Sequence, residues 1–285
     1  MIFNSPYKQL DRKINTWCKY TKRLDTYGCG CQHNCDYCYA KSLLSFRGLW
    51  NVKEPAEARL QTIRDEIRKL TTNDVVRIGG MTDCFQPIEK IKRITYNTIQ
   101  LLNFFKINYL IVTKSDLVAS DEYLKIYNEK LAHFQITITS TSPNKYEKAP
   151  IPKRRIKAIE KLQESGFDVS VRLSPFIIQN IDLKILNKIK CNKILIEFLK
   201  VNYNVKKWFN INYDDYSLRF GGFEHLELEH KIDLVNKITG FSQLTVGEYV
   251  KDHYQYFRDN VNYNKNDCCN LILKYFPDPQ LKLNL

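Results

Sequence analysis

Three cysteines stand close together in the first part of the chain, at Cys31, Cys35 and Cys38. The run that contains them has little regular period, so we expect a loop that directly follows a strand. Three thiolates on one loop can each bind one iron of a four-iron, four-sulfur cubane, and the usual fourth cysteine is missing from this run. The spacing therefore predicts a [4Fe-4S] cluster with one iron open to a further ligand.

A zinc ion is the alternative occupant, with Cys29 as the fourth ligand of a tetrahedron. Structural zinc sites more often take two separated pairs of ligands, whereas these four cysteines would crowd one short loop. Under this alternative the chain is a zinc-stabilised, non-catalytic nucleic-acid-binding protein, with basic residues interleaved with Trp17, Tyr20 and Tyr27. If the cluster is correct, Cys29 ends the strand as a small buried residue.

The remaining cysteines bear on the cellular compartment. The chain has nine cysteines, and its first residues lack the apolar core of a secretory signal, so we expect reduced thiols in a cytoplasmic protein without a membrane span. Cys268 and Cys269 are adjacent in the sequence. They could supply a hydrogen atom, help to bind a second cluster or pack in the core, and of these we favour packing.

The elements that must position these cysteines alternate between short apolar runs and longer segments of helical period. This alternation is typical of a parallel α/β protein. Predicted strands cover residues 25–29, 75–79, 109–113, 134–139, 168–173 and 193–198. Predicted helices cover residues 55–70, 88–105, 121–131, 152–165 and 181–189. Six such units, closed or partly closed, form a barrel that collects ligands at the carboxyl ends of its strands.

Three regions follow from this pattern: a basic segment at 1–24, a partial (β/α)6 barrel at 25–199, and an aromatic-rich extension or cap at 200–285. Helices are predicted in the extension near 226–238 and 246–260. The net charge of +13 favours an anionic partner such as DNA or a nucleotide. Basic residues gather at 8–23, at 153–157 and around Lys200, Lys206 and Lys207. A general excess of lysine in the composition would explain the charge equally well.

The run from Cys31 to Cys38, continued by Tyr39 and Ala40, resembles the radical S-adenosylmethionine (SAM) superfamily. Within it, the chain is similar to the spore photoproduct lyase and DNA repair photolyase-like group and its phage-borne relatives. Further agreement lies at Gly-Gly-Met-Thr-Asp-Cys-Phe-Gln-Pro-Ile-Glu (79–89), Thr-Lys-Ser (113–115), the threonine-rich fourth strand, Arg154-Arg155 and Val-Arg-Leu-Ser-Pro (171–175). The resemblance covers roughly residues 25–180.

The resemblance implies a radical SAM enzyme in the cytoplasm of a bacterial or phage-infected cell. Its cofactors would be a [4Fe-4S] cluster on Cys31, Cys35 and Cys38 and SAM at the open iron. An electron from a flavodoxin-type or ferredoxin-type reductant would cleave SAM to a 5′-deoxyadenosyl radical, which takes hydrogen from the substrate. A nucleic-acid or nucleotide base, repaired or modified, is the expected substrate. A small molecule or peptide is the alternative, because the tail after residue 199 does not resemble the lyases.

The resemblance also implies roles for single residues. Tyr37 would place its backbone against the adenine, and with Tyr39 it would relay a hydrogen atom; packing is the alternative for both side chains. The residues expected to contact SAM are Gly79, Gly80, Thr82, Lys114, Thr139, Thr141 in the adjacent register, and Arg172. The alternatives are a tight turn for the two glycines, a solvated lysine, and a salt bridge in the barrel for the arginine.

Cys84 would return a hydrogen atom to the product radical by this resemblance. The match is imperfect, because in the lyases the donor precedes a Thr/Ser-Ser/Thr-Asp stretch, whereas Cys84 follows Thr82-Asp83. A buried core cysteine is the alternative.

Overall fold

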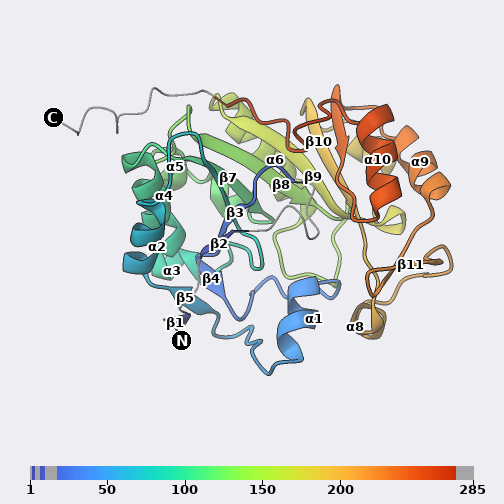
Figure 1. The fold of residues 1–285 in the computed structure, drawn as a ribbon, viewed down its shortest axis with the longest axis horizontal. Coiled ribbons are helices and arrows are strands. Elements are labelled where there is room, and N and C mark those ends of the chain that lie inside the picture. Colours follow the sequence, from blue (N-terminus) through green and yellow to red (C-terminus); the bar gives the residue numbers. More distant parts are fainter. Residues whose placement is uncertain (1, 4–6, 10–17, 274–285) are drawn as a thin grey trace.

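The protein is built on one curved sheet of eight strands (Figure 1). The computed structural model describes residues 2–3, 7–9 and 18–273. The strand order is β13 (Gln243–Val246), β10 (Lys193–Phe198), β9 (Asp168–Phe176), β8 (Ala132–Ile138), β7 (Asn108–Thr113), β6 (Val75–Ile78), β3 (Lys22–Leu24) and β2 (Tyr7–Gln9). All neighbours pair in parallel except β2 and β3. Within the described residues β13 and β2 are opposite edges, so the expected partial barrel is confirmed.

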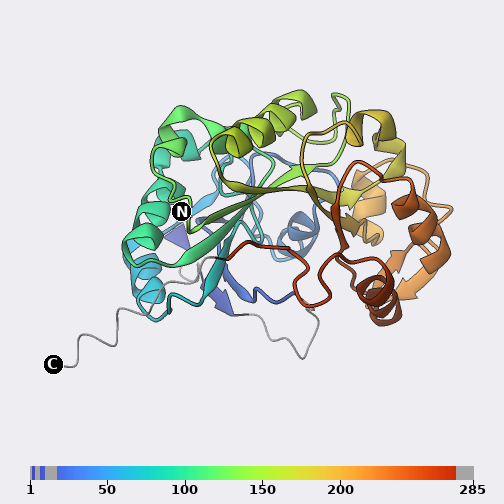
Figure 2. The same ribbon diagram turned by 90° about the horizontal axis from the view of Figure 1, so that it is seen from above.

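The central strands are buried on both faces, as parallel sheets require. Every residue of β7 and β8 is buried. Helices cover the convex face in Figure 2; they are α2 (Leu60–Ile67), α4 (Ile94–Phe104), α5 (Asp121–Leu124), α6 (Pro152–Glu164) and α7 (Leu183–Leu186). No helix in the described part of the chain is long and apolar enough to cross a membrane.

The first predicted strand, 25–29, was wrong in its position. β3 ends at Leu24, because the Asp25 carboxylate accepts hydrogen bonds from the backbone N–H groups of Gly80 and Met81 at 2.8 and 2.9 Å. The chain then turns away. β4 (Tyr27–Gly28) joins a second small sheet with β5 (Ala56–Ala58) and β1 (Ile2–Phe3).

Four predicted helices are shorter than their patterns. The segment 55–70 begins with β5, so its helix starts only at Leu60. The segment 88–105 is divided into α3 (Glu89–Lys92) and α4 at Arg93, whose φ of 55° is left-handed. The segments 121–131 and 181–189 contain only the single turns α5 and α7.

A buried carboxylate fastens this division between α3 and α4. Glu89 accepts hydrogen bonds from the N–H groups of Thr95 at 3.0 Å and Tyr96 at 2.8 Å. It also accepts from the hydroxyls of Tyr27 and Tyr123. One carboxylate therefore joins β4, the start of α4 and α5.

The extension after residue 199 adds one strand, β13, to the same sheet, while β11 and β12 form a separate two-stranded sheet. Its elements are α8 (Tyr203–Trp208), β11 (Leu218–Phe220), β12 (Phe223–His225), α9 (Leu228–Asn236), β13 and α10 (Lys251–Asn260). The predicted helix at 246–260 was wrong at its start, because Val246 pairs with Ile196 in the sheet and the helix begins at Lys251. The boundaries at 24 and 199 stay predictions, and the main sheet crosses both. Half of the basic segment 1–24, including Trp17, lies outside the described residues.

Candidate active site

The cysteine loop leads from β4 into the helix α1 (Tyr39–Ser45) at the carboxyl end of the sheet (Figure 1). Two backbone hydrogen bonds coil it, from Asn34 N to Cys31 O at 3.1 Å and from Cys38 N to Cys35 O at 3.2 Å. Cys38 caps α1, because its Sγ accepts from the N–H of Lys41 at 3.4 Å. The loop thus holds its three thiols in a fixed order before α1.

The segment 79–89, which follows β6, is hydrogen-bonded to one side of the cysteine loop. The Gln86 side-chain oxygen accepts from Gln32 N at 2.8 Å, and the Gln32 side-chain oxygen accepts from Ile88 N at 2.6 Å. The His33 ring lies 3.3 Å from the carboxylate of Asp83. Two segments that the sequence separates by more than fifty positions are therefore locked together.

The loop after β8 fastens the cysteine loop from the other side. Asp36 N donates to Tyr146 O at 2.9 Å, and Lys148 N donates to His33 O at 2.6 Å. The side chain of Glu147, between these two anchors, consequently points toward the cysteines. Its Oε2 lies 3.9 Å from Cys35 Sγ.

The cysteines fit an iron-sulfur cluster better than one zinc ion. Two sulfurs bound to one zinc at about 2.3 Å are at most about 4.6 Å apart. Among the described residues, no three of the Sγ atoms of Cys29, Cys31, Cys35 and Cys38 all lie within 4.8 Å of one another. Ligands to separate irons of a cubane are not bound by that limit, so this spacing argues against one zinc ion and is compatible with the cluster.

Electrostatics favours a bound metal of either kind at these cysteines. Burial raises the pKa of the Cys31 thiol to about 12 and also raises the pKa of Cys35 and Cys38. Lys114 is a positive charge that acts against this increase at Cys35 and Cys38. The thiols therefore need the charge of a bound metal to become thiolates.

Lys114 is positioned by Asp83. The Asp83 carboxylate accepts from Lys114 N at 2.7 Å and from the Thr113 hydroxyl at 2.6 Å. Burial by itself would raise the pKa of Asp83, but His33 and these hydrogen bonds outweigh burial and lower it. The Lys114 Nζ lies 5.7 Å from the centre of the Tyr37 ring, so the ammonium faces the cysteine loop.

The glycines after β6 allow a close approach between strands. Gly79 has a φ of 87°, and a Cβ there would lie 2.5 Å from the carbonyl oxygen of Val112. Gly80 donates its N–H to Asp25, and its carbonyl accepts from the Tyr39 hydroxyl at 2.6 Å. Thr82 is buried, with its hydroxyl donating to Tyr27 O at 2.6 Å. Contact of these residues with SAM stays a prediction.

A buried ion pair behind Cys35 was missed by the sequence analysis. Glu147 pairs with Arg155, and it also accepts from the hydroxyls of Tyr37 and Thr139. Burial raises the pKa of Glu147, but Arg155 and Lys114 outweigh this and lower it. Glu147 thus gathers the predicted residues Tyr37 and Thr139 at Cys35, and the charge of Lys114 acts on the same carboxylate. The sequence gives no signal for Glu147 except its place after the threonine-rich strand.

The other predicted residues are more dispersed. Thr141 lies apart from the cysteines, with its hydroxyl accepting from Asp182 N at 2.7 Å. Arg172 is buried and donates to Gln135 at 2.7 Å and to Glu197. Cys84 is only 1% exposed, with its Sγ 3.5 Å from where a Cβ on Gly79 would lie. Their catalytic or cofactor roles stay predictions.

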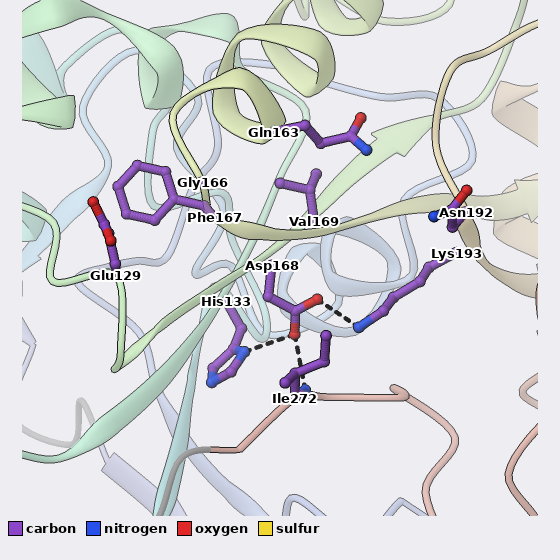
Figure 3. Close-up of a pocket in the computed structure, with 10 residues that line it drawn as sticks. All are labelled: Glu129, His133, Gln163, Gly166, Phe167, Asp168, Val169, Asn192, Lys193 and Ile272. Atoms are coloured by element: carbon purple, nitrogen blue, oxygen red, sulfur yellow. Dashed lines mark hydrogen bonds and ion pairs between the residues drawn. The ribbon is translucent and has the colours of Figure 1, made fainter.

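A pocket of about 230 Å³ lies at the opposite ends of the strands (Figure 3). Its wall includes His133, Asp168 and Lys193, which stand at the amino ends of β8, β9 and β10. Asp168 accepts from His133 Nδ1 at 2.8 Å and pairs with Lys193 at 2.5 Å. Burial by itself would raise the pKa of Asp168, but these partners lower it to about 2. Parallel sheets bind substrates at their carboxyl ends, so this pocket is separate from the cysteine site.

Comparisons with known proteins agree with this geometry. The sequence pattern of the Radical SAM superfamily matches residues 26–187. An uncharacterized protein of Methanocaldococcus jannaschii is 27% identical over 202 residues, which cover 65% of this chain and 74% of that protein.

Two kinds of solved structure have a fold similar to that of this chain. A spore photoproduct lyase complexed with a dinucleoside spore photoproduct has a TM-score of 0.58 at 14% identity, over 84% of this chain and 79% of that chain. SuiB of Streptococcus suis, bound to the precursor peptide SuiA, has a TM-score of 0.52 at 13% identity, over 79% of this chain and 48% of that chain. At these identities the likeness shows the fold.

Proposed function

The chain belongs to the Radical SAM superfamily, and we propose that it acts on a base of a nucleic acid or nucleotide. Its cofactors are a [4Fe-4S] cluster and SAM. When both are bound and an electron is supplied, they provide a 5′-deoxyadenosyl radical that can take hydrogen from a substrate. A one-electron reductant of the flavodoxin or ferredoxin type is the proposed donor. The protein's own contribution is to bind, orient and enclose.

Within this proposal, Cys31, Cys35 and Cys38 hold the cluster. Lys114 is the proposed partner of a cofactor carboxylate, because its ammonium stands over Tyr37 beside the cysteine loop. The ion pair of Glu147 and Arg155 holds Tyr37 in place from behind. Lys114 and the backbone around Gly80 thus provide charge and hydrogen-bonding groups on two sides of the loop.

Tyr39 is the better candidate for handling a hydrogen atom. Tyr39 as a residue is 48% exposed, and its hydroxyl donates to the carbonyl of Gly80, whereas Cys84 is 1% exposed beneath Gly79. A group that exchanges a hydrogen atom with a substrate has to reach that substrate. We therefore propose Tyr39 for this role and a packing role for Cys84.

A surface of aromatic and basic side chains on α1 and α8 is the main support for a nucleic-acid substrate. Beside the cysteine loop, α1 and α8 lie next to each other (Figure 1), and the Asn204 side chain donates to the Ser42 hydroxyl at 2.9 Å. Aromatic and basic side chains gather on these helices and the residue after α1; the surface that we call the aromatic-basic ridge consists of Lys41, Phe46, Tyr203, Lys206, Lys207 and Trp208. Phe46 is 92% exposed and Tyr203 is 78% exposed.

This composition suits single-stranded nucleic acid or an unstacked base. Aromatic faces stack on bases, at about 1–3 kcal/mol for each base, while lysines contact the phosphates. The Lys41 Nζ already lies 4.6 Å from the ring centre of Trp208, so charge and ring are combined on one surface. The photolyase-like motifs and the net charge of +13 add to this support.

The test is substrate-dependent formation of 5′-deoxyadenosine by the anaerobically reconstituted protein with dithionite and SAM. Single-stranded and duplex oligonucleotides, each with and without ultraviolet damage, are compared with free nucleotides and a peptide mixture. We expect stimulation by a nucleic acid or nucleotide. Formation of a repaired pair of bases would indicate lesion repair, whereas a new base mass would indicate modification.

Variants in the aromatic-basic ridge test whether this surface binds the nucleic acid. Phe46→Ala combined with Tyr203→Ala should weaken oligonucleotide binding about tenfold or more, because each lost stacking contact is worth about 1–3 kcal/mol. Tyr263→Ala, a 61% exposed tyrosine outside the ridge, is the control. Binding should also weaken steeply with salt. Stimulation by peptides alone, or binding independent of salt and of the ridge, would refute the proposal.

A further inference from the structure

Three cysteines outside the predicted cluster come together in the structure. Cys18 precedes β3, and Cys268 and Cys269 lie near the end of the described chain. Their Sγ atoms all lie within 4.8 Å of one another, and within the described residues they are the only such group of three or more His, Cys, Asp or Glu. The sequence separates Cys18 from the pair by some 250 positions, which is why no motif predicted it.

The spacing of the adjacent pair is that of two ligands to a single ion. Tetrahedral coordination at about 2.3 Å places two sulfurs about 3.8 Å apart. The Sγ atoms of Cys268 and Cys269 are 3.9 Å apart. In contrast, among the residues that the structure covers, no three of the sulfurs of Cys29, Cys31, Cys35 and Cys38 all lie within 4.8 Å of one another. The two sets of cysteines therefore differ in the kind of metal centre that they fit.

A turn allows neighbouring side chains to face the same partner. In an extended strand Cys268 and Cys269 would point to opposite sides. Here Asp267 accepts from Cys269 N at 3.0 Å through its side chain and from Asn270 N at 3.2 Å through its carbonyl. Asn270 has a left-handed φ of 50°, which completes the turn.

The turn is held in place on both sides by contacts that need no metal. The Tyr20 hydroxyl donates to Asp267. Beyond the cysteines, Asn270 accepts from Lys193 Nζ at 2.6 Å and donates to Thr245 at 2.8 Å. Figure 2 shows this red C-terminal segment on the side of the sheet away from the helices, near the blue N-terminal strands. The three thiols are therefore preorganised.

The surroundings suit a negatively charged centre. Three thiolates and one divalent ion carry a net charge of −1. Arg77 on β6 acts electrostatically on Cys18, and Arg172 on β9 acts on Cys269. The Nε of Arg77 is buried without a hydrogen-bond partner in the described part of the chain.

We propose that Cys18, Cys268 and Cys269 bind one zinc ion, with water as the fourth ligand. Zinc is a divalent ion that thiolates bind well in tetrahedral geometry, and binding releases the thiol protons. The ion fastens the C-terminal turn to the segment that leads into β3. This site goes beyond the proposed function, since neither SAM nor the substrate takes part in it.

The test is metal analysis of the full-length reconstituted protein together with its variants. The wild type should contain four irons and one zinc per chain. The triple variant Cys18→Ser, Cys268→Ser and Cys269→Ser should lose the zinc and keep the irons. The matched control Cys191→Ser changes a buried cysteine elsewhere and should keep both metals.

A second measurement does not depend on the folding of a variant. Cobalt(II) exchanged into the wild-type protein should give the intense visible absorption of a tetrahedral ion and a thiolate charge-transfer band. Absence of a stoichiometric divalent ion from the wild type would overturn the proposal. So would iron and sulfide at these cysteines, a disulfide between any two of them, or a zinc content that the triple variant does not change.

Discussion

Removing Arg155 tests whether the buried ion pair behind Cys35 supports the site. Arg155 is 1% exposed, and its guanidinium donates to Pro150 O at 2.6 Å, to Thr137 O at 3.2 Å and to Glu147. In Arg155→Met two carbonyls lose a donor, at about 1 kcal/mol each. Glu147 becomes a buried carboxylate without its cation. Loss of one partner of a buried pair costs about 3–5 kcal/mol, which is a large part of a total stability of roughly 5–15 kcal/mol.

The measurement is anaerobic urea unfolding of the purified protein, with the slope of the transition held as a check on two-state behaviour. The double variant Arg155→Met, Glu147→Met removes the unpaired charge as well, so we expect it to recover about 2 kcal/mol or more. The control is Arg154→Met. That neighbouring side chain is 61% exposed and pairs with Asp116 on the surface, so its loss should cost less than about 1 kcal/mol.

Two outcomes would refute a stabilising role of the Arg155–Glu147 ion pair. If Arg155→Met costs no more than Arg154→Met, the buried pair does not stabilise the fold. If the double variant is less stable than Arg155→Met alone, the penalty does not come from the unpaired carboxylate of Glu147. Either outcome would remove the proposed support for Tyr37.

Two further predictions concern a glycine and a carboxylate. Gly79→Ala should lower the free energy of unfolding in urea by more than about 2 kcal/mol, because the new Cβ would lie 2.5 Å from Val112 O. The control Gly222→Ala has a φ of 80° and open space around it, so it should lower that free energy by only about 1 kcal/mol. Equal losses would contradict the close approach of Gly79 to Val112. Asp168, with a folded pKa of about 2 against about 3.9 unfolded, stabilises the protein by about 2.5 kcal/mol above pH 4. The folded pKa is the lower one, so this stability is lost as the pH falls from about 4 to 2. Asp168→Asn should therefore lose its stability difference from the wild type in acid, and a difference unchanged from pH 6 to 2 would refute the assignment.

Much of the fold could be predicted because its signals are local. The apolar runs at β6, β7 and β10 are bounded by polar residues, and each strand lies within two residues of its prediction. The helix 152–165 was found because Pro152 and the Ser165-Gly166 pair mark its ends. Local propensity failed where a distant side chain decides. Asp25 ends β3 by binding the backbone at Gly80, and the break at Arg93 is stabilised by Glu89, which the distant Tyr27 and Tyr123 hold in place.

The same distinction applies to the site. The cysteine spacing and the motifs at the strand ends consist of residues that are close together in the sequence, so the candidate cofactor site could be predicted from them. Glu147 could not, because its role depends on hydrogen bonds that bring the loop after β8 against His33. Cys18 could not either, because its partners lie at the other end of the chain. β13 was not predicted because it has only four residues, and its last residue, Val246, was placed in the predicted helix 246–260.

The contact between Tyr20 and Asp267 has a consequence for how the protein is made. The two residues are 247 positions apart. A ribosome adds about 5–20 residues per second, so roughly 12–50 seconds separate their synthesis. Leu110 and Val112, which pack with Tyr20 and Cys269, are made about 90 positions into that interval and lack their last neighbour for the rest of it. The nascent protein therefore presents an apolar surface to the translation machinery and its chaperones until the final turn emerges.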